Sequence, residues 1–432
     1  MTTTVNEPAT GGAARPAAGL PRLLPLVPGL PEDLRAHLGR YGRPPYRGGP
    51  GLLINAIQAA GLTGRGGAAF PVHRKLAVVA GARGRKVIVA NGAESEPASH
   101  KDDLLLRVAP NLVLDGLQLA AEAVGASEAY LYLHPGHHPE LLRAFAERSA
   151  AGIDWLQVTL AEAPPRFLAG QESAVVNRLG GGPALPTFVP PRVSDRGLGG
   201  APTLVQNVET LAHIAHIARY GPRWFRALGT DTEPGSMLTT VHHAHGDSQV
   251  IEAEIGAPLR ALLADQAEAQ AVLIGGFHGT WLPISQAAAT TLDNQALKKH
   301  GAAVGAGLIA ALPADRCGLA EAARVTRYLA AESAGQCGPC LNGLPSIAGG
   351  LAELAGPRPR RQTRENVERW AGLVTGRGAC NHPDGTVRFV RSALKVFARE
   401  LTRHEQGRCS ATNRRPFLPL PQGMPTTEDD WT

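Results

Sequence analysis

The sequence predicts an α/β protein in three parts: a domain with a parallel sheet, a small β-rich domain and a C-terminal helical bundle. Three observations predict this architecture. Short apolar segments rich in β-branched residues alternate with segments of helical periodicity, as in parallel sheets covered by helices. Two strand-like segments around a turn then replace this alternation, and after Pro313 the pattern is helical. The 432 residues allow several domains, and a 44% hydrophobic content is sufficient for their cores.

The first domain is predicted over residues 21–230, with strands and helices in alternation. Strands are predicted where short apolar runs contain β-branched residues, and helices where apolar residues recur at helical spacing. The predicted strands are 86–90, 129–133 and 155–161, and the predicted helices are 31–41, 51–60, 110–124, 139–150 and 207–220. The alternating order indicates strands that run parallel in one sheet.

The second domain is predicted over residues 231–312 and has the pattern of a small β-grasp domain. Two strand-like segments flank the turn sequence His245-Gly246-Asp247. Further strands and one short helix follow. The predicted strands are 236–242, 250–255, 271–274 and 308–312, and the predicted helix is 259–264.

The C-terminal part is predicted to be a helical bundle over residues 313–406. Four segments have helical periodicity, which is enough for a bundle with a shared core. These predicted helices are 319–333, 344–355, 364–375 and 386–404. Both chain ends are expected to be flexible, because residues 1–20 are rich in Thr, Ala, Gly and Pro and residues 407–432 are rich in Pro.

The composition excludes several classes of protein. The net charge is +6, and the basic residues are scattered without interleaved aromatic residues, so no nucleic-acid partner is predicted. No run of about 18 apolar residues predicts a membrane span. The first residues lack a basic segment followed by an apolar one, so we expect a cytoplasmic protein. Five cysteines in this length fit reduced thiols or a metal site better than a disulfide framework.

A glycine-rich loop follows the helix predicted at 51–60. Gly64, Gly66 and Gly67 allow the backbone to approach a ligand closely, and successive backbone N–H groups can hold a phosphate. Lys75 follows and can add a positive charge. The spacing matches neither the dinucleotide fingerprint nor a Walker loop, so an ordinary turn is an equal alternative from these residues alone.

Three further segments carry polar residues at positions suited to a ligand. The first directly follows the strand at 86–90, and ligands of open α/β sheets bind beyond the carboxyl ends of strands. Its two glutamates share a face if the chain is extended, and a solvated acidic loop is the alternative. The last segment begins a helix, where its polar residues could also be ordinary caps. The candidates are Asn91, Glu94, Glu96, Gly170, Glu172, Asn207 and Thr210.

Taken together, these four segments resemble the flavin-bearing, NADH-oxidising subunit of bacterial respiratory complex I. Related subunits occur in NAD-linked hydrogenases and formate dehydrogenases. The resemblance extends from about residue 22 to residue 404, and the order and spacing of the motifs agree with the family. The motifs are Gly64-Arg-Gly-Gly-Ala-Ala-Phe-Pro71 with Lys75, Glu94-Ser-Glu-Pro97, the segment from Phe167 to Ala174, and Asn207-Val-Glu-Thr-Leu211.

The resemblance implies an FMN-binding domain, a soluble-ligand-binding β-grasp (SLBB) domain and a bundle that carries an iron–sulfur cluster. It implies hydride transfer to the flavin and transfer of single electrons through the cluster to a redox partner. A flavin suits this task because it accepts two electrons together and releases them singly. Phe70 and Glu96 are expected on the nicotinamide nucleotide side. The residues expected at FMN are Gly64, Gly66, Gly67, Lys75, Asn91, Glu94, Gly170, Glu172, Asn207 and Thr210.

Several positions depart from the family pattern. The family has acidic residues where this chain has Ala93 and Gln171, and a tyrosine where Phe167 stands. Two aromatic residues and a lysine that would flank the nicotinamide nucleotide are also replaced. These replacements are at Val78, Arg192 and Val189. Because stacking contributes to nucleotide affinity, weak binding of NADH or a different electron donor is the expected consequence.

The cysteines add a metal motif. Cys337 and Cys340 form a C-x₂-C pair and Cys380 follows after a helix, a spacing that suits an iron–sulfur cluster or zinc. The family binds one [4Fe–4S] cluster with C-x₂-C-x₂-C and one remote cysteine, and here Ala334 replaces the first cysteine. The alternatives are a three-cysteine [4Fe–4S] cluster, a [3Fe–4S] cluster, zinc or no metal. A fourth ligand could be water, an external group, Asn381, His382 or Cys409.

The remaining cysteine and histidine positions are expected to have no metal. Cys317 is expected to be a small buried hydrophobic residue. His242, His243 and His245 are close in sequence, and a surface turn is expected there.

The leading functional hypothesis is therefore an oxidoreductase that depends on FMN and an iron–sulfur cluster and uses an NADH-like donor. Its expected partner is a small redox protein, either ferredoxin-like or a thioredoxin-like iron–sulfur protein. The alternatives are a catalytically degenerate paralogue that acts as a scaffold or binds a ligand, and an FMN enzyme that receives electrons from ferredoxin.

Overall fold

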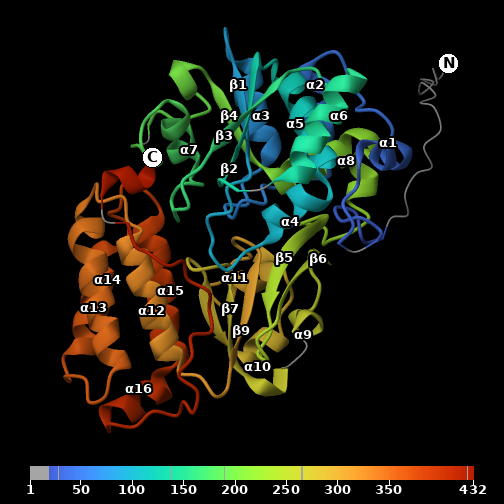
Figure 1. Ribbon diagram of the computed structural model, residues 1–432. Helices are drawn as coiled ribbons and strands as arrows, with labels where there is room; N and C mark the ends of the chain where they lie inside the picture. Colours follow the sequence, from blue (N-terminus) through green and yellow to red (C-terminus); the bar gives the residue numbers. More distant parts are fainter. Residues whose placement is uncertain (1–18, 28, 137, 189, 264–265, 426) are drawn as a thin grey trace, which may run out of the picture.

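The computed structural model describes residues 19–432 except 28, 137, 189, 264, 265 and 426. Figure 1 shows an α/β part, a second sheet next to it and a helical bundle beside that sheet. The predicted fold class is confirmed. Almost all of the tail expected at residues 1–20 lies outside the described residues.

The first sheet has four parallel strands in the order β3-β2-β1-β4. They are β1 (Val87–Asn91), β2 (Glu128–Leu133), β3 (Val158–Glu162) and β4 (Thr203–Asn207). In β1 the residues from Val87 to Ala90 are completely buried, as the apolar run predicts for a strand with helices on both faces. The strand β4 was not predicted, because its short run ends in two polar residues.

Helices surround this sheet. They are α1 (Leu34–Tyr41), α2 (Pro50–Ala60), α3 (Val72–Gly81), α4 (Lys101–Val108), α5 (Pro110–Val124), α6 (Pro139–Ala151), α7 (Glu172–Leu179) and α8 (Val208–Phe225), with a 3₁₀ turn η1 (Leu198–Gly200). The long helices α5 and α8 pack against each other and are almost entirely buried. The helices α3, α4 and α7 were not predicted, since each has only eight to ten residues and borders a segment interpreted as a ligand loop.

The order of the strands creates a crevice. From β1 the chain adds β2 and β3 on one side, and then returns to place β4 on the other side of β1. In open α/β sheets, ligands bind outside the carboxyl ends of the strands at such a reversal of strand order. In this chain that point lies beyond Asn91 of β1 and Asn207 of β4, which are register partners.

The second sheet has five strands in the order β6-β5-β9-β7-β8. The strands are β5 (Ser236–His242), β6 (Ser248–Glu254), β7 (Ala269–Ile274), β8 (Thr280–Pro283) and β9 (Leu308–Pro313). The pair β5–β9 is parallel, and the other pairs are antiparallel. The short helical elements here are α9 (Leu259–Leu262), η2 (Gln266–Glu268), α10 (Ile284–Ala288) and α11 (Asn294–Lys298). The strand pair predicted around residue 246 is confirmed.

The helical part contains α12 (Gly318–Ala331), α13 (Leu344–Ala355), α14 (Thr363–Val374), α15 (His382–Val396) and α16 (Ala398–Glu405), with a π-helical turn η3 (Pro339–Gly343). The prediction of one last helix was wrong, because the chain leaves helical geometry at Phe397. The Phe397 ring packs closely against Gly318 and lies 5.3 Å from the Trp281 ring. This packing accompanies the change of direction between α15 and α16.

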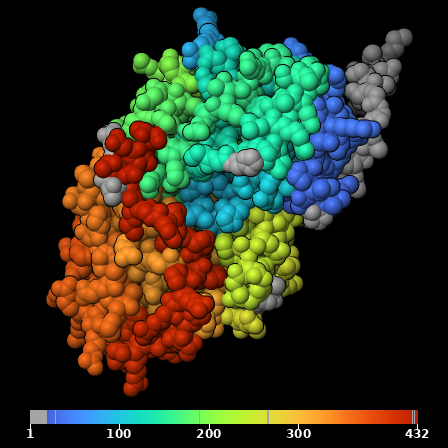
Figure 2. Space-filling model, in the orientation of Figure 1, coloured from blue at the N-terminus to red at the C-terminus, as the bar shows by residue number. Residues whose placement is uncertain are grey.

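The C-terminal segment 407–432 was expected to be flexible, but the structure packs it against the rest of the protein. Leu418 and Trp431 are buried, and a last 3₁₀ turn, η4 (Glu428–Trp431), ends the chain. The backbone N–H of Phe417 donates to Glu321 at 2.7 Å. Figure 2 shows this segment running along the bundle toward the α/β part. Its proline content misled the prediction, because proline does not prevent apolar side chains from packing.

No single helix in the described part of the chain is long and apolar enough to cross a membrane. The helices α4 and α5 together pass by length and composition alone, with a bend of 96° between them.

The contact between α5 and α8 gives a prediction for stability. A Cβ atom at Gly116 would collide with the backbone of Leu211, so Gly116→Ala should lower the free energy of unfolding by at least about 1–3 kcal/mol. Urea unfolding measures this change. Gly349→Ala is the matched control, since Gly349 is in α13 with open space around it, and it should be neutral or stabilising by up to about 1 kcal/mol. Equal stability of the two variants would contradict the close contact.

Candidate functional site

The crevice beyond β1 and β4 begins with two asparagines. Asn207 caps α8, since its Oδ1 accepts from the Glu209 N–H at 3.0 Å. Its amide Nδ2 donates to Asp102 at 2.7 Å. On β1, the Asn91 amide donates to the carbonyl of Gly170 at 2.8 Å. Both predicted residues therefore have fixed orientations at the carboxyl edge of the sheet.

The glycine loop lies directly against Asn207 and the start of α8. A Cβ atom at Gly66 would lie 3.3 Å from the Asn207 Cβ, and Gly67 has a positive φ of 102°. The backbone N–H of Arg65 donates to the Thr210 hydroxyl at 2.9 Å. The loop, Asn207 and Thr210 thus form one wall, as predicted, and the glycines permit the close approach of the two backbones.

A second wall forms around Gly170. Its N–H donates to the Ser95 hydroxyl at 2.9 Å. A Cβ atom at Gly170 would lie 2.7 Å from the same hydroxyl and 2.9 Å from the Ala93 carbonyl, so no side chain fits there. This wall holds the segment after β1 against the segment that leads into α7.

Lys75 of α3 and Glu172 of α7 pair across the site. The Lys75 Nζ lies 3.0 Å from the Glu172 Oε1, and both side chains are partly exposed. Since exposed ion pairs contribute little to stability, these two groups are available to a ligand at small cost. The structure therefore brings together seven predicted positions in addition to Gly64, namely Gly66, Lys75, Asn91, Gly170, Glu172, Asn207 and Thr210.

Glu94 has a different environment from the one expected. Its carboxylate accepts from the backbone N–H groups at the start of α4, at 2.9–3.2 Å, and from the Ser99 hydroxyl. Burial raises the pKa of Glu94 to about 7, and the nearby Asp102 contributes to this rise. The carboxylate serves as a helix cap, and the structure shows no free face of it toward the glycine loop.

Glu96 and Phe70, expected on the nucleotide side, also differ in exposure. Phe70 is 37% exposed. Glu96 accepts from the Phe277 N–H at 2.8 Å through Oε2, whereas its Oε1 has no hydrogen-bond partner among the described residues. Burial raises the pKa of Glu96 to about 8. A buried carboxyl oxygen without a partner is costly, so a donor from a ligand would be favourable there.

Sequence reasoning missed a buried ionic group beneath the site. Lys101 lies between Asp102 at 2.7 Å and Glu209 at 2.9 Å. Glu209 also accepts from the Leu238 N–H of β5 at 2.8 Å, which ties the two sheets together. Burial alone would raise the pKa of Glu209, but the Lys101 charge lowers it to about 2. Charged residues in short helices normally indicate solvent exposure, so the sequence carried no signal for this group.

Three thiols gather at the end of the bundle that faces the α/β part. Cys337 and Cys340 lie at η3, Cys380 lies in the loop before α15, and both loops are at the same end of the bundle. Burial raises the pKa of the Cys340 thiol to about 12, with further contributions from Cys337 and Cys380. In the described chain these three sulfur atoms are not all within 4.8 Å of one another, which is wider than the ligands of a single ion. A cluster whose metal atoms each take one thiolate suits this spacing better than zinc does.

His382 is not available as a fourth ligand in this arrangement. Its Nε2 bonds to the Leu329 carbonyl at 2.8 Å and its Nδ1 to His278 at 2.9 Å. Burial lowers the pKa of His382 to about 4, so the ring is neutral at pH 7. Ala334, at the position of the missing cysteine, is partly buried, and Asn381 is exposed.

The segment before Gly170 connects the two sites. The Phe167 ring lies 6.0 Å from Tyr328 of α12 and 4.8 Å from the His278 ring. Its backbone N–H donates to Glu332 at the end of α12, at 2.9 Å. The flavin-side wall and the cysteine loops are therefore held by one short stretch of chain.

Two departures from the resemblance have local explanations, and one expectation was wrong. Gln171 caps α7 through its side-chain oxygen, which accepts from Ser173 and Ala174 N–H groups. Val78 is 48% exposed on α3. His242 and His243 are buried rather than at a surface turn, since their strand end is covered by the segment around Ala98. The predicted position Val189 lies outside the described residues.

Comparison with known proteins agrees with this geometry. Residues 57–216 match the family described as the Nuo51 FMN-binding domain, and residues 320–404 match the NADH-ubiquinone oxidoreductase-F iron–sulfur binding region. The second F-type component of the NADH-quinone oxidoreductase of Rhizobium meliloti is 28% identical over 87% of this chain and 92% of its own length. The F-type component of the NADH-quinone oxidoreductase of Streptomyces coelicolor is 29% identical over 87% of this chain and 88% of its own length.

Solved structures give the same result. Two structures of NAD⁺-reducing [NiFe]-hydrogenase match with TM-scores of 0.74 and 0.75, at 29% and 28% identity, over 82% and 88% of this chain. The chain spans 62% and 65% of those solved chains, so it is less than two thirds of their length. The fold and the two sites define a flavoprotein of the iron–sulfur class. The chain belongs to the family of the NADH-quinone oxidoreductase F subunits.

The buried Glu96 gives a pH-dependent prediction. Its pKa is about 8 in the folded chain against an ordinary value of 4.5, so between these pH values the folded state holds one more proton than the unfolded state. Stability should therefore fall as pH rises through this window, and Glu96→Gln should flatten the fall by up to about 1 kcal/mol per pH unit. Urea unfolding from pH 5 to pH 8.5 measures it. The exposed Glu162→Gln is the control and should follow the unmodified chain; parallel profiles for all three would contradict the prediction.

Proposed function

We propose that this protein is an oxidoreductase that accepts two electrons from an NADH-like donor at FMN and passes single electrons through an iron–sulfur cluster to a redox partner. One observation carries the proposal. The crevice at the reversal of strand order and the three-thiol end of the bundle are joined by the stretch from Arg166 to Gly170. The matches to an FMN-binding domain and an iron–sulfur binding region over the same residues support it.

The crevice fits a flavin nucleotide. Gly66 and Gly170 leave no room for side chains of their own, so the backbone itself forms the walls of the cradle. Asn91, Asn207 and Thr210 would orient polar atoms of the flavin, while Lys75 would supply positive charge near its phosphate. When bound, FMN supplies the exchange between two-electron and one-electron chemistry. The residues that would hold it are Gly64, Gly66, Gly67, Lys75, Asn91, Gly170, Glu172, Asn207 and Thr210, with Glu94 supporting the loop through α4.

The bundle end fits an iron–sulfur cluster held by three cysteines. Thiolates are the usual ligands of such clusters, and burial of Cys340 favours a low-dielectric setting in which bound metal replaces the thiol protons. With Ala334 in the first position and both ring nitrogens of His382 engaged, we propose that the fourth iron of a [4Fe–4S] cluster takes a ligand from outside the four-residue motif.

The electron donor is the second point on which two candidates differ. Val78 offers no aromatic ring for stacking, and the Glu96 carboxyl is held by the Phe277 N–H, so the groups expected to grip NADH are weak. These observations favour ferredoxin as an alternative donor to the same flavin. We also propose a small ferredoxin-like or thioredoxin-like iron–sulfur partner, since the relatives are named as subunits, and an SLBB assignment for residues 231–312, since their mixed sheet has a parallel central pair.

Anaerobic purification tests the proposed function. The protein should contain about one FMN per chain, a flavin absorption spectrum, and iron with acid-labile sulfide. Addition of NADH should bleach the flavin bands; bleaching by reduced ferredoxin only would select the alternative donor. Absence of both flavin and iron from protein that is folded by circular dichroism would contradict the proposal and favour a degenerate scaffold.

Lys75 gives a residue-level prediction. Lys75→Ala should weaken FMN retention by roughly tenfold, because a charge-assisted contact to the phosphate contributes about 1.5–3 kcal/mol. Fluorescence titration of FMN into the dialysed protein measures this. Lys86→Ala is the control, since Lys86 precedes β1 at the opposite edge of the sheet and donates to the Ala80 carbonyl. Equal FMN affinity of the two variants would exclude Lys75 from the flavin site.

A further inference from the structure

A second group of metal-type ligands lies at the end of the bundle remote from the three-thiol site. It consists of Cys317, Glu400, His404 and Cys409, and one ligand atom from each lies within 4.8 Å of the others. Among the residues that the structure describes, only this group brings three or more such atoms so close. Since α12 has 14 residues, the two ends of the bundle are about 20 Å apart, and the groups are separate.

Cys317 is placed as a thiolate ligand would be. It caps α12, and its sulfur accepts from the Ala320 N–H at 3.4 Å. The partial positive charge of a helix N-terminus favours a thiolate. Burial raises the pKa of Cys317 to about 12, so the thiol keeps its proton unless a cation displaces it. The expectation of a buried small residue is confirmed, but its surroundings are not apolar.

His404 of α16 has the orientation of a metal-binding imidazole. Its Nδ1 lies 3.0 Å from the Leu354 carbonyl, an acceptor, so Nδ1 carries the ring proton. The Nε2 lone pair then faces the Cys317 sulfur at 3.6 Å. A backbone carbonyl behind the imidazole is the usual arrangement that fixes the tautomer of a histidine ligand.

Glu400 and Cys409 complete the group. The Glu400 Oε1 lies 3.3 Å from the His404 Nε2. Its carboxylate is held by Ser410, through the backbone N–H at 2.7 Å and the hydroxyl at 2.6 Å. Burial alone would raise the pKa of Glu400, but these hydrogen bonds lower it, so the group is charged at pH 7. Cys409, the residue before Ser410, is exposed and leaves a path for an ion to enter.

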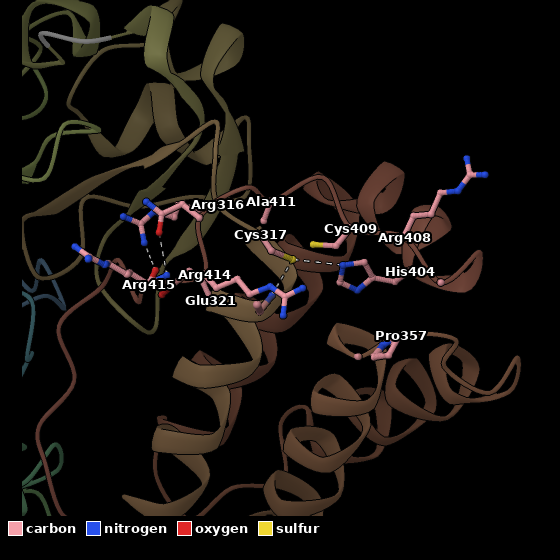
Figure 3. Close-up of a pocket in the computed structure, with 14 residues that line it drawn as sticks. Arg316, Cys317, Glu321, Pro357, His404, Arg408, Cys409, Ala411, Arg414 and Arg415 are labelled. Atoms are coloured by element: carbon pink, nitrogen blue, oxygen red, sulfur yellow. Dashed lines mark hydrogen bonds between the residues drawn. The ribbon is translucent and has the colours of Figure 1, made fainter.

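The group lines a cavity of about 450 Å³. Figure 3 shows the Cys317 thiol, the His404 ring and the Cys409 thiol directed toward one another. Four arginines line the same cavity, and Figure 3 shows Arg408 pointing away from the group. Two thiolates and a carboxylate with a divalent cation would carry one net negative charge, which the arginines would offset. These four arginines are Arg316, Arg408, Arg414 and Arg415.

We propose that Cys317, His404, Cys409 and Glu400 bind one divalent metal ion of the zinc type. Two sulfurs, one imidazole and one carboxylate are the tetrahedral ligand set that zinc takes. Binding would release the two thiol protons and form no other covalent bond. The ion would fasten the start of α12, the helix α16 and the segment 407–432 to one another. This inference is independent of the proposed redox function.

Metal analysis of the full-length protein tests the site. Zinc should be present at about one per chain in the protein purified with zinc in the medium. After removal of zinc with a chelator, added Co²⁺ should produce thiolate-to-cobalt charge-transfer absorption. Cys409→Ser should weaken Co²⁺ binding by more than about 100-fold, since loss even of a group behind a ligand costs about 10–100-fold. Because Cys409 is exposed, this variant should fold; Cys317→Ser and His404→Ala give the same readout from the buried side.

A matched variant separates the two metal sites. Cys337→Ser should lose iron and keep zinc, whereas Cys409→Ser should keep iron and lose zinc. Zinc and cobalt binding unchanged in Cys409→Ser would overturn the assignment. So would a Cys317–Cys409 disulfide, found by mass spectrometry in protein purified anaerobically, because two thiols joined to each other cannot bind the ion. Either result leaves the flavin and iron content, and hence the proposed function, undisturbed.

Discussion

The parallel pairing of β1 with β4 is the interaction on which the site depends. It places Asn91 beside Asn207 at one sheet edge, and the reversal of strand order at this pair leaves the crevice between their carboxyl ends. The pairing also starts α8 at the crevice, where Thr210 receives the glycine loop. Without β4 beside β1, the glycine loop would have no backbone to approach, and the polar residues of four distant segments would not share one wall.

Buried charge holds this arrangement in position. Lys101, Asp102 and Glu209 lie beneath the crevice, and Glu209 reaches β5 of the second sheet. In the same domain Asp115 binds His37, Arg148 and Arg219, which joins four helices. Replacing such groups by apolar residues can be neutral, but removing one partner leaves an uncompensated buried charge and costs about 3–5 kcal/mol. These groups therefore act on the relative positions of the elements more than on the total stability.

The helical part presents sulfur ligands at both of its ends. One end faces the α/β part and carries Cys337, Cys340 and Cys380, and the other carries Cys317 and Cys409. The stretch around Phe167 joins the first end to the flavin-side wall. An electron-transfer role at one end and a structural role at the other are compatible, because the length of α12 separates them. The C-terminal segment then gains a physical reason to pack against the bundle.

The sequence by itself determined the order of the elements, the glycine loop and the C-x₂-C pair, because periodicity and short motifs are local properties. It also determined the departures at Ala334 and Gln171. Only the tertiary structure decided that Glu94 caps α4, that both nitrogens of His382 are engaged, and that Cys409 meets Cys317 across 92 residues of chain. It also decided that residues 407–432 pack. These outcomes depend on which groups are brought together after folding, and burial, hydrogen-bond partners and contacts between distant segments have no local signature in the chain.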